Sequence, residues 1–416
     1  MDVSRHQTIG DWLMTFVSEI LDQMPNITKP QKQFLQLLFS TILSLRGRVN
    51  FLNLSRYTTR SEKTFRRHFR RPFDFLSFNL LAIEKATSAS STKIAAFDST
   101  FIHKSGKKTF GLDSFFNSCA GRPERGLELS VVSIVDLEQN TAYALDALQT
   151  VTPVASTNSK SEREETRVDF YLKHFAAVRA SLPTEVVYGV FDGYFAKKKF
   201  VNGILAMNLH VISKLRSDAN LRYGFTGQQK QRGRKRQYDG KVRFSDLSRF
   251  QRVGEVEERI NLLTAICYHP RLERWLRVVV VENRNKKEKP RLAVLFSTNT
   301  EEDAKEVYRY YKARFQIEFL FRDAKQQAGL EHCQARDQKA LHYHFNAALT
   351  TVNVTKVEFQ RAREEERNVF SMSSFKQQSY NEHFMEMIIS KLDMEPSVIK
   401  NHPQYEFLRN YAAIAA

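Results

Sequence analysis

Two aspartates in this chain each end a short apolar run. Asp98 ends KIAAFD, and Asp192 ends VVYGVFD just before Gly193. Apolar runs of this length are typical of buried strands, and α/β folds bind ligands at the carboxyl ends of such strands. Gly193 lets the backbone turn sharply and leaves space beside the second carboxylate. An aspartate at a strand end is also common in ordinary turns, so these two acids need a third element to indicate chemistry.

The third element is a polar stripe along a predicted single helix over residues 301–327. At successive intervals of three, four and seven residues, the stripe contains Tyr311, Arg314, Glu318 and Lys325. At about 100° per residue, these positions fall within roughly 60° of one another around the helix. A solvated stripe with an Arg314–Glu318 ion pair is the alternative, but it requires neither the tyrosine nor these intervals. We therefore interpret Glu318 as a third functional acid between two cations.

The helix motif Y-x2-R-x3-E-x6-K resembles the signature of bacterial insertion-sequence transposases with an Asp-Asp-Glu catalytic site, in particular the insertion sequence four family. The surrounding segments are similar too: KIAAFDST, VFDGYF, VISKLRSDANL and KARFQIEFLFRDAKQQAGLEHCQAR. The resemblance covers roughly residues 90–350. It implies a ribonuclease H-like core in which Asp98, Asp192 and Glu318 hold divalent ions. It also implies a β-rich insertion between the second and third acids.

Cleavage of a phosphodiester needs an activated water and a stabilised leaving oxygen, and two divalent ions about 3.5–4 Å apart supply both. Mg²⁺ prefers oxygen ligands and keeps several waters, so two or three carboxylates suffice, and we expect Mn²⁺ to substitute. Carboxylates with a pKa near 4 repel one another at about pH 7, so we expect a site that is poorly ordered until metal enters. We expect Arg314 and Lys325 to face DNA phosphates, and Tyr311 to contact a phosphate or a sugar.

The overall charge of the chain indicates a polyanionic partner. The 416 residues include 64 Lys and Arg against 46 Asp and Glu, which gives a net charge of +18. Such a charge repels itself in the compact state, and nucleic acid is the first candidate partner. An anionic membrane is the second, but the longest apolar stretch, residues 34–45, is too short to span a bilayer. Because Cys119, Cys267 and Cys333 lie far apart, we expect neither a disulfide framework nor a zinc site.

We predict an α/β fold with a ribonuclease H-like mixed-sheet core flanked by helices, a β-rich insertion and a helical N-terminal DNA-binding domain. The predicted units are the N-terminal domain over residues 1–90, the first part of the core over 91–218, the insertion over 219–290, the second part of the core with the glutamate helix over 291–362, and C-terminal helices over 363–416. The N-terminus lacks the features of a secretion signal, so we expect a cytoplasmic, nucleoid-associated prokaryotic protein.

Basic side chains outside the stripe are candidate DNA contacts. Ser61 is the predicted cap of a helix that Pro72 ends, and this helix suits a reader of the element end through Lys63, Arg66, Arg67, Arg70 and Arg71. The RGRKR segment suits a minor groove or a line of phosphates through Arg232, Arg234, Lys235 and Arg236. Lys214 and Arg216 follow a predicted core strand and are further candidate phosphate contacts. An ordinary solvated surface is the alternative for each set.

Trp275, one of two tryptophans, lies in the predicted insertion. Hairpin-forming relatives of the resembled family stack a flipped base on an aromatic side chain there, and such stacking is worth about 1–3 kcal/mol. A buried core position in a β-rich unit is the alternative for Trp275.

Together these features predict a transposase that cleaves the ends of its element and transfers them into target DNA. Cut-and-paste transposition through a DNA hairpin is one expected route. The implied partners are double-stranded DNA, both as inverted-repeat ends and as target, and a second copy of the chain in the paired-end complex; no membrane partner is expected. Two alternatives remain: a catalytically inactive, sequence-specific DNA-binding protein, and a structure-specific nuclease on the same core.

Overall fold

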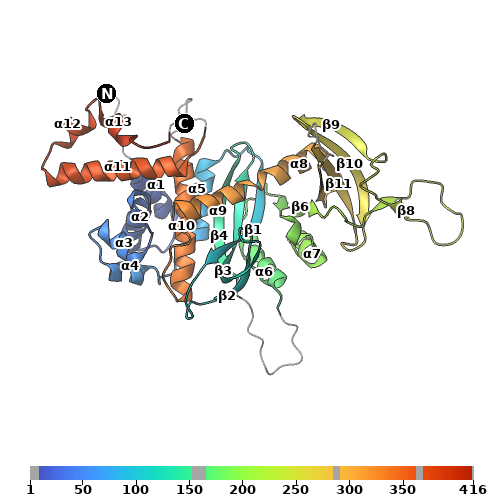
Figure 1. Cartoon of the computed structure of the whole chain (residues 1–416), viewed down its shortest axis with the longest axis horizontal. Helices are drawn as coiled ribbons and strands as arrows, with labels where there is room; N and C mark the ends of the chain where they lie inside the picture. The colour runs from blue at the N-terminus through green and yellow to red at the C-terminus, as the bar shows by residue number, and fades with distance from the viewer. Residues whose placement is uncertain (1–8, 152–164, 284–290, 362–368, 415–416) are drawn as a thin grey trace, which may run out of the picture.

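The computed structural model of the chain describes residues 9–151, 165–283, 291–361 and 369–414. Its long axis runs from an end where the N- and C-terminal helices lie together, through a central sheet, to an end made mostly of strands (Figure 1). The fold is mixed α/β with a mixed sheet, as the sequence predicted. Among the described residues, no helix is both long enough and apolar enough to cross a membrane.

Within the described residues, twelve strands form one sheet in the order β2-β3-β1-β5-β6-β12-β11-β10-β7-β8, with β4 also paired to β3 and β9 to β10. The strands are β1 (Lys93–His103), β2 (Asp113–Asn117), β3 (Arg122–Asp136), β4 (Thr141–Gln149), β5 (Tyr188–Val190), β6 (His210–Leu215), β7 (Arg222–Gly224), β8 (Tyr238–Lys241), β9 (Gln251–Glu257), β10 (Ile260–His269), β11 (Arg274–Asn283) and β12 (Arg291–Ser297). In the middle of the sheet, β5 pairs in parallel with both β1 and β6, whereas the flanking pairs are antiparallel.

Helices cover both faces of the central strands. They are α1 (Ile9–Gln23), α2 (Lys29–Ser44), α3 (Phe51–Arg56), α4 (Glu62–His68), α5 (Phe75–Ala86), α6 (Arg167–Arg179), the short 3₁₀ helix η2 (Gly193–Phe195), α7 (Lys198–Ala206), α8 (Ala304–Ala313), α9 (Gln316–Gln326), α10 (Gln338–Arg361), α11 (Met372–Lys391), α12 (Pro396–Lys400) and α13 (Tyr405–Arg409). α5, α9 and α10 pack against β4, while α6 packs against β3 and α7 against β6.

Strand β1 lies at the centre of this arrangement and is longer than predicted. It does not end at Asp98 but continues to His103, because β3 pairs with it from Lys93 to His103. Strand β5 pairs with β1 at only two positions, the second of which places Ala96 opposite Val190. Asp98 therefore lies within β1, just beyond the point at which its parallel neighbour stops.

The helices predicted for the N-terminal region are observed as α1 to α5, which lie between Ile9 and Ala86. Ser61 caps α4, and its hydroxyl accepts a hydrogen bond from the backbone N of Thr64 at 3.4 Å. The prediction that Pro72 ends this helix is wrong, since α4 already ends at His68. The apolar face of α4 packs on Phe34 of α2, so its basic face points outward.

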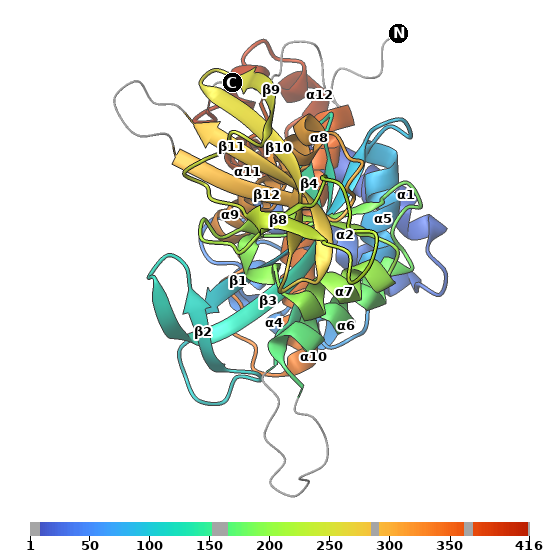
Figure 2. The same cartoon turned by 90° about the vertical axis from the view of Figure 1, so that its right-hand side faces the viewer.

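Residues 219–290 contain strands, as predicted, and these strands continue the central sheet. β10 and β11 pair along their whole length, β11 pairs with β12, and β12 pairs with β6. Figure 2 views the molecule from this strand-rich end. The RGRKR segment lies in the loop between β7 and β8. The charged segment RNKKEKP, residues 284–290, which the sequence suggests as a hairpin tip, lies outside the described residues.

The predicted single helix over residues 301–327 is wrong, because a tight turn at Arg314 and Phe315 separates α8 from α9. The backbone N atoms of Ile317 and Glu318 each donate to the carbonyl oxygen three residues earlier, at 3.0 Å, and such bonds tighten a helix locally. α8 packs against β6, β12, β11 and β10, whereas α9 packs against β1, β3 and β4. The turn therefore lies where the two parts of the sheet meet.

Two asparagines of α10 cover the edge strand β4. Asn346 accepts a hydrogen bond from Ala147 N and donates one to Ala147 O, at 3.0 and 2.9 Å. Asn353 makes the same pair of bonds with Ala144, at 2.9 and 2.7 Å. The side-chain amides thus satisfy backbone groups that a neighbouring strand would otherwise pair with, and this protects the edge of the central sheet.

Candidate active site

Strand alternation directs Asp98 toward the turn between α8 and α9. Its neighbour Phe97 is fully buried against aromatic side chains of α6 and α7 such as Tyr171, so the next side chain points to the opposite face of the sheet. On that face, Oδ2 of Asp98 accepts a hydrogen bond from Nη1 of Arg314 at 3.0 Å. Its Oδ1 accepts one from the backbone N of Ser99 at 2.8 Å. The strand therefore holds this carboxylate in one orientation.

Asp192 stands two residues after β5, at the end of a buried strand as predicted, and caps η2. Its Oδ1 accepts a hydrogen bond from the backbone N of Tyr194 at 2.8 Å. Because Ala96 lies opposite Val190 in the parallel β1–β5 pair, Asp98 and Asp192 each follow two residues further along their strands. Neighbouring strands are about 4.8 Å apart, so the two aspartates lie side by side.

Glu318 joins them from the first turn of α9. Its Oε1 accepts a hydrogen bond from Nη2 of Arg314 at 3.0 Å. A single guanidinium thus contacts one carboxylate from β1 and one from α9. The Arg314 side chain is 8% exposed, whereas that of Glu318 is 42% exposed. The structure therefore brings together an acid from a central strand and an acid from a helix far along the chain.

Burial dominates the electrostatics of this cluster. Burial, together with the charges of Asp192 and Glu318, raises the pKa of Asp98 to about 6 against the lowering effect of the Arg314 guanidinium. Burial acts to lower the pKa of Arg314, but the neighbouring Asp98, Tyr311 and Glu318 hold that pKa above its ordinary value. Burial raises the pKa of Tyr311, on which Arg314 and Asp192 have opposite effects. Asp192 affects the pKa values of Asp98, Arg314 and Tyr311, so it belongs to the same electrostatic cluster.

The two remaining residues of the stripe lie in different surroundings. The guanidinium carbon of Arg314 is 5.7 Å from the centre of the Tyr311 ring, so the tyrosine borders the cluster. Lys325 is directed toward β1: its Nζ donates to the carbonyl oxygen of Phe101 at 2.7 Å and pairs with Glu331 at 3.1 Å. Lys325 therefore ties α9 to the central strand.

The donor atoms of the cluster suit a hard divalent ion, because Asp98, Asp192 and Glu318 all offer carboxylate oxygens. Within the described residues, however, no group of three or more His, Cys, Asp or Glu side chains is arranged to hold a metal ion. Arg314 takes one oxygen of Asp98 and one of Glu318. The repulsion predicted between the carboxylates is thus offset here by a cation of the chain itself.

The segment that contains all three acids matches a known family. A family model for the transposase DDE domain matches residues 89–354. The chain belongs to the DDE transposase family. No curated protein matches the chain in sequence. Family membership implies that this transposase binds DNA and that its general function is transposition, so the predicted resemblance is confirmed at that level.

The loop between β7 and β8 presents several basic residues of the transposase to solvent. Three of the four predicted contacts, Arg232, Arg234 and Lys235, are exposed and form no hydrogen bond or ion pair with the described residues. Arg236 differs, since its Nε donates to Tyr238 O at 3.0 Å and its Nη2 pairs with Asp239 at 2.9 Å. Three cations of this loop are therefore available to an external anion.

Helix α4 also carries both paired and unpaired basic side chains. Lys63 and Arg67 are exposed and have no hydrogen-bond or ion-pair partner for their side chains in the described part of the chain. Arg66 pairs with Glu62, and Arg70 pairs with Asp337 at 3.4 Å. Only part of the predicted basic surface is therefore unpaired.

Lys214 and Arg216 lie near the end of β6. The carbonyl oxygen of Lys214 is so close to Gly193 that a Cβ atom there would lie 3.1 Å from it, which is tighter than ordinary contact and favours glycine beside Asp192. Arg216 pairs with Asp218 at 3.0 Å. Lys214 thus approaches the second aspartate through its backbone, while its side chain is exposed.

Trp275 lies on β11 and is 39% exposed, so the buried core position considered from sequence is not observed. Its ring lies 5.5 Å from that of Tyr268 and 6.1 Å from that of Tyr238, measured between centroids. The three side chains form an aromatic cluster whose tryptophan is accessible to solvent.

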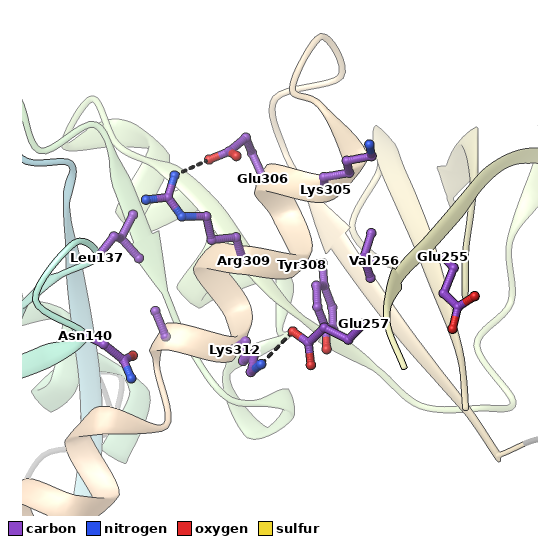
Figure 3. A pocket seen from close by; sticks show the side chains of 11 residues that line it. Leu137, Asn140, Glu255, Val256, Glu257, Lys305, Glu306, Tyr308, Arg309 and Lys312 are labelled. Atoms are coloured by element: carbon purple, nitrogen blue, oxygen red, sulfur yellow. Dashed lines mark hydrogen bonds and ion pairs between the residues drawn. The ribbon is translucent and has the colours of Figure 1, made fainter. Parts of the chain in front are cut away.

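A cavity of about 510 Å³ lies between α8, β9 and the turn that joins β3 to β4 (Figure 3). Four of its charged side chains form ion pairs: Lys312 with Glu257, and Arg309 with Glu306 at 3.2 Å. None of the three candidate acids lines it. The cavity is therefore separate from the acid cluster.

Sequence reasoning missed a buried polar triad. Ser130 Oγ lies 2.7 Å from His174 Nδ1, and His174 Nε2 lies 3.0 Å from Asp146 Oδ2, the same order of groups as in serine hydrolases. Ser130 is fully buried, His174 is 2% exposed, and the Ser130 hydroxyl also donates to Leu148 O at 3.1 Å. Since substrate has no access to Ser130, the triad fastens α6 to β3 and β4 and does not form a second active site.

Proposed function

We propose that this transposase cleaves DNA at the ends of its element and joins those ends to target DNA, with Asp98, Asp192 and Glu318 as the ligands of two Mg²⁺ ions. The observation that carries the proposal is the cluster itself: one central strand, the end of its parallel neighbour and a distant helix contribute one carboxylate each. Carboxylates gathered in this way repel one another unless cations accompany them, and Mn²⁺ is expected to replace Mg²⁺.

A ribonuclease H-like core fits the topology of the central strands. The order β4-β3-β1-β5-β6, in which only β3 runs antiparallel to β1, supports this assignment. The strands within residues 219–290 fall between the second and third acids, where the insertion sequence four family has a β-rich insertion. The motif of Tyr311, Arg314, Glu318 and Lys325 supports membership of that family.

Divalent ions bound here would activate the attacking water and stabilise the leaving oxygen. The side chains of the chain have separate tasks. Asp98 is fixed by β1 and Asp192 by η2, so both carboxylates keep their positions during the reaction, while the Glu318 side chain is more exposed than that of Asp98. In the DNA complex, Arg314 and Lys325 are proposed to contact phosphates and Tyr311 a phosphate or a sugar.

The same proposal includes a cut-and-paste reaction, with a hairpin as one route. Exposed Trp275 is the candidate that stacks a flipped base. Two transposon ends must be paired, so a homodimer is the proposed active assembly. An N-terminal DNA-binding unit is proposed to read the element end through the unpaired residues Lys63 and Arg67.

Cleavage of the sequences that flank the gene tests this function. The full chain should nick duplexes with its own inverted repeats in Mg²⁺ or Mn²⁺, whereas Asp98→Asn and Asp192→Asn should bind the duplex without cutting it. Glu301→Gln, at an exposed acid before α8, is the matched control and should remain active. Full activity in either aspartate variant would remove the assignment.

A second assay separates the transposase from the two alternatives. Precut ends are supplied together with a target plasmid, and the joined product is measured. A transposase joins them, a nuclease on the same core cuts but does not join, and an inactive DNA-binding protein does neither.

A further inference from the structure

Arg314 occupies the centre of the acid cluster. Its two terminal nitrogens each contact a different carboxylate: Nη1 lies 3.0 Å from Asp98 Oδ2, and Nη2 lies 3.0 Å from Glu318 Oε1. Its side chain is 8% exposed, so water screens these contacts little. The guanidinium thus bridges the acid of β1 and the acid of α9.

This bridge uses the same oxygens that a divalent ion needs. Asp98 Oδ1 and Asp192 Oδ1 already accept backbone hydrogen bonds from Ser99 and Tyr194, and Arg314 occupies Asp98 Oδ2 and Glu318 Oε1. A guanidinium and a divalent ion repel each other at such short range. Arg314 and metal are therefore competitors for the space between Asp98 and Glu318.

One donor of the Arg314 guanidinium has no hydrogen-bond partner in this position. Its Nε is buried and has no hydrogen-bond partner, and a buried polar group without a partner is unfavourable. A phosphate accepts two parallel hydrogen bonds from an arginine, which can include the one from Nε. The tight turn at Arg314 and Phe315 carries this side chain between two helices that pack on different parts of the sheet. DNA phosphate is thus a better partner for the whole guanidinium than the two acids are.

We propose that Arg314 is an internal counter-ion that holds Asp98 and Glu318 in the DNA-free chain, and that a DNA phosphate draws it away so that metal can enter. This inference rests on the proposed function of the three acids. It makes the binding of DNA and the binding of metal mutually favourable. A transposase without an element end then holds little metal and does not cut other DNA.

The test measures Mn²⁺ binding, by electron paramagnetic resonance of the free ion, to the full chain with and without a precut end duplex. A precut duplex prevents turnover from affecting the measurement. The wild-type chain should bind Mn²⁺ weakly alone and about 5- to 150-fold more tightly with the duplex, the usual range of coupling between sites. Arg314→Gln should bind Mn²⁺ tightly without DNA and gain little when the duplex is added.

Two further variants separate charge from structure. Arg314→Lys keeps a cation in the cluster, so it should bind Mn²⁺ as weakly as the wild type without DNA; it also provides a folded comparison if Arg314→Gln is unstable. Arg322→Gln, at an arginine of the following helix α9 that pairs with Asp323 at 3.0 Å, is the matched control. Its Mn²⁺ affinity should equal that of the wild type in both conditions.

Equal or weaker Mn²⁺ binding by Arg314→Gln than by wild type, both without DNA, would overturn this inference while leaving the proposed function intact. The same holds if DNA raises the Mn²⁺ affinity of Arg314→Gln as much as that of the wild type. If Mn²⁺ binds none of these proteins even with the duplex, or binds Asp98→Asn as tightly as the wild type, the proposed function fails as well.

Discussion

The acid cluster and the loop between β7 and β8 carry their charges in opposite ways. In the cluster, Arg314 is nearly buried and contacts two carboxylates. In the loop, Arg232, Arg234 and Lys235 are exposed and have no partner among the described residues. A buried charge is tolerated only with a partner, whereas an exposed one keeps its hydration and remains available to a polyanion. Under the proposed function, this difference separates charges that prepare the reaction from charges that hold the DNA.

Helix α4 shows that this distinction applies to single residues. Arg66 pairs with Glu62, while its neighbours Lys63 and Arg67 have no side-chain partner in the described residues. Charge counts alone treat the three cations as equivalent. The contacts instead provide matched pairs of variants, in which removal of a paired and of an unpaired cation can be compared.

The largest effect is expected at the acid cluster. Glu318→Gln removes one metal-binding charge, and a metal contributes several kcal/mol to the transition state, so end cleavage should fall by roughly 10³-fold or more. DNA affinity, measured without divalent ions, should change by less than about twofold, because exposed phosphate contacts supply that affinity. Single-turnover cleavage and filter binding measure the two quantities. A comparable loss in both would contradict the separation of reaction from binding.

The loop should show the converse behaviour. Replacing Arg232, Arg234 and Lys235 with alanine removes three phosphate contacts, so the slope of log affinity against log salt should decrease by about 3. Cleavage at saturating DNA should stay near the wild-type rate. Arg236→Ala is the control, because the Arg236 guanidinium already pairs with Asp239. In this variant the slope of log affinity against log salt should change by less than about 1. Equal effects of Arg234→Ala and Arg236→Ala would contradict the comparison.

Helix α4 permits the same test with a smaller expected effect. Lys63→Ala combined with Arg67→Ala should lower the salt slope by about 2. Arg66→Ala should lower it less, since Arg66 already pairs with Glu62. If α4 reads the element end, the double variant should also reduce the preference for end sequence over unrelated DNA, as measured by competition binding.

The sequence predicted the local features of this molecule well. Apolar runs located β1 and the strand before Asp192, and the Ser61 cap located the start of α4. Such patterns depend only on residues that are neighbours in the sequence, so they can be identified without a structure. The three acids were predicted as one cluster only because strand ends and a helical stripe were combined with a family resemblance.

The remaining features depend on contacts between distant segments. No proline or glycine marks the turn at Arg314 and Phe315, and packing of α8 and α9 on different strands accompanies it. β1 runs past Asp98 because β3 pairs with it. A helical projection placed Arg314 beside Glu318 but gave no indication that Asp98 lies opposite. Likewise, nothing local in α10 indicated that Asn346 pairs with the β4 edge.

The smallest predicted effect comes from a histidine beneath the unpaired cations of α4. His68 is 7% exposed and its ring stacks on Phe34 with centroids 3.9 Å apart. Burial, reinforced by the positive charges of Arg71, Arg67 and Arg60, lowers the pKa of His68 to about 4. An unfolded histidine has a pKa near 6.5. Protons therefore bind the unfolded chain more readily, and the contribution of neutral His68 to stability, complete above about pH 6.5, is lost as the pH falls toward about 4.

His68→Phe preserves the stacking without a titratable group, so the melting temperature of the wild type should fall a few degrees further than that of the variant between about pH 7 and about pH 5. Arg67→Ala removes one of the repelling charges and should narrow this difference. Bound DNA should narrow it too, because phosphates neutralise the same unpaired cations. If Arg66→Ala narrowed the difference as much as Arg67→Ala, the paired and unpaired cations of α4 would be electrostatically equivalent, and the comparison between paired and unpaired charge would not extend to this helix.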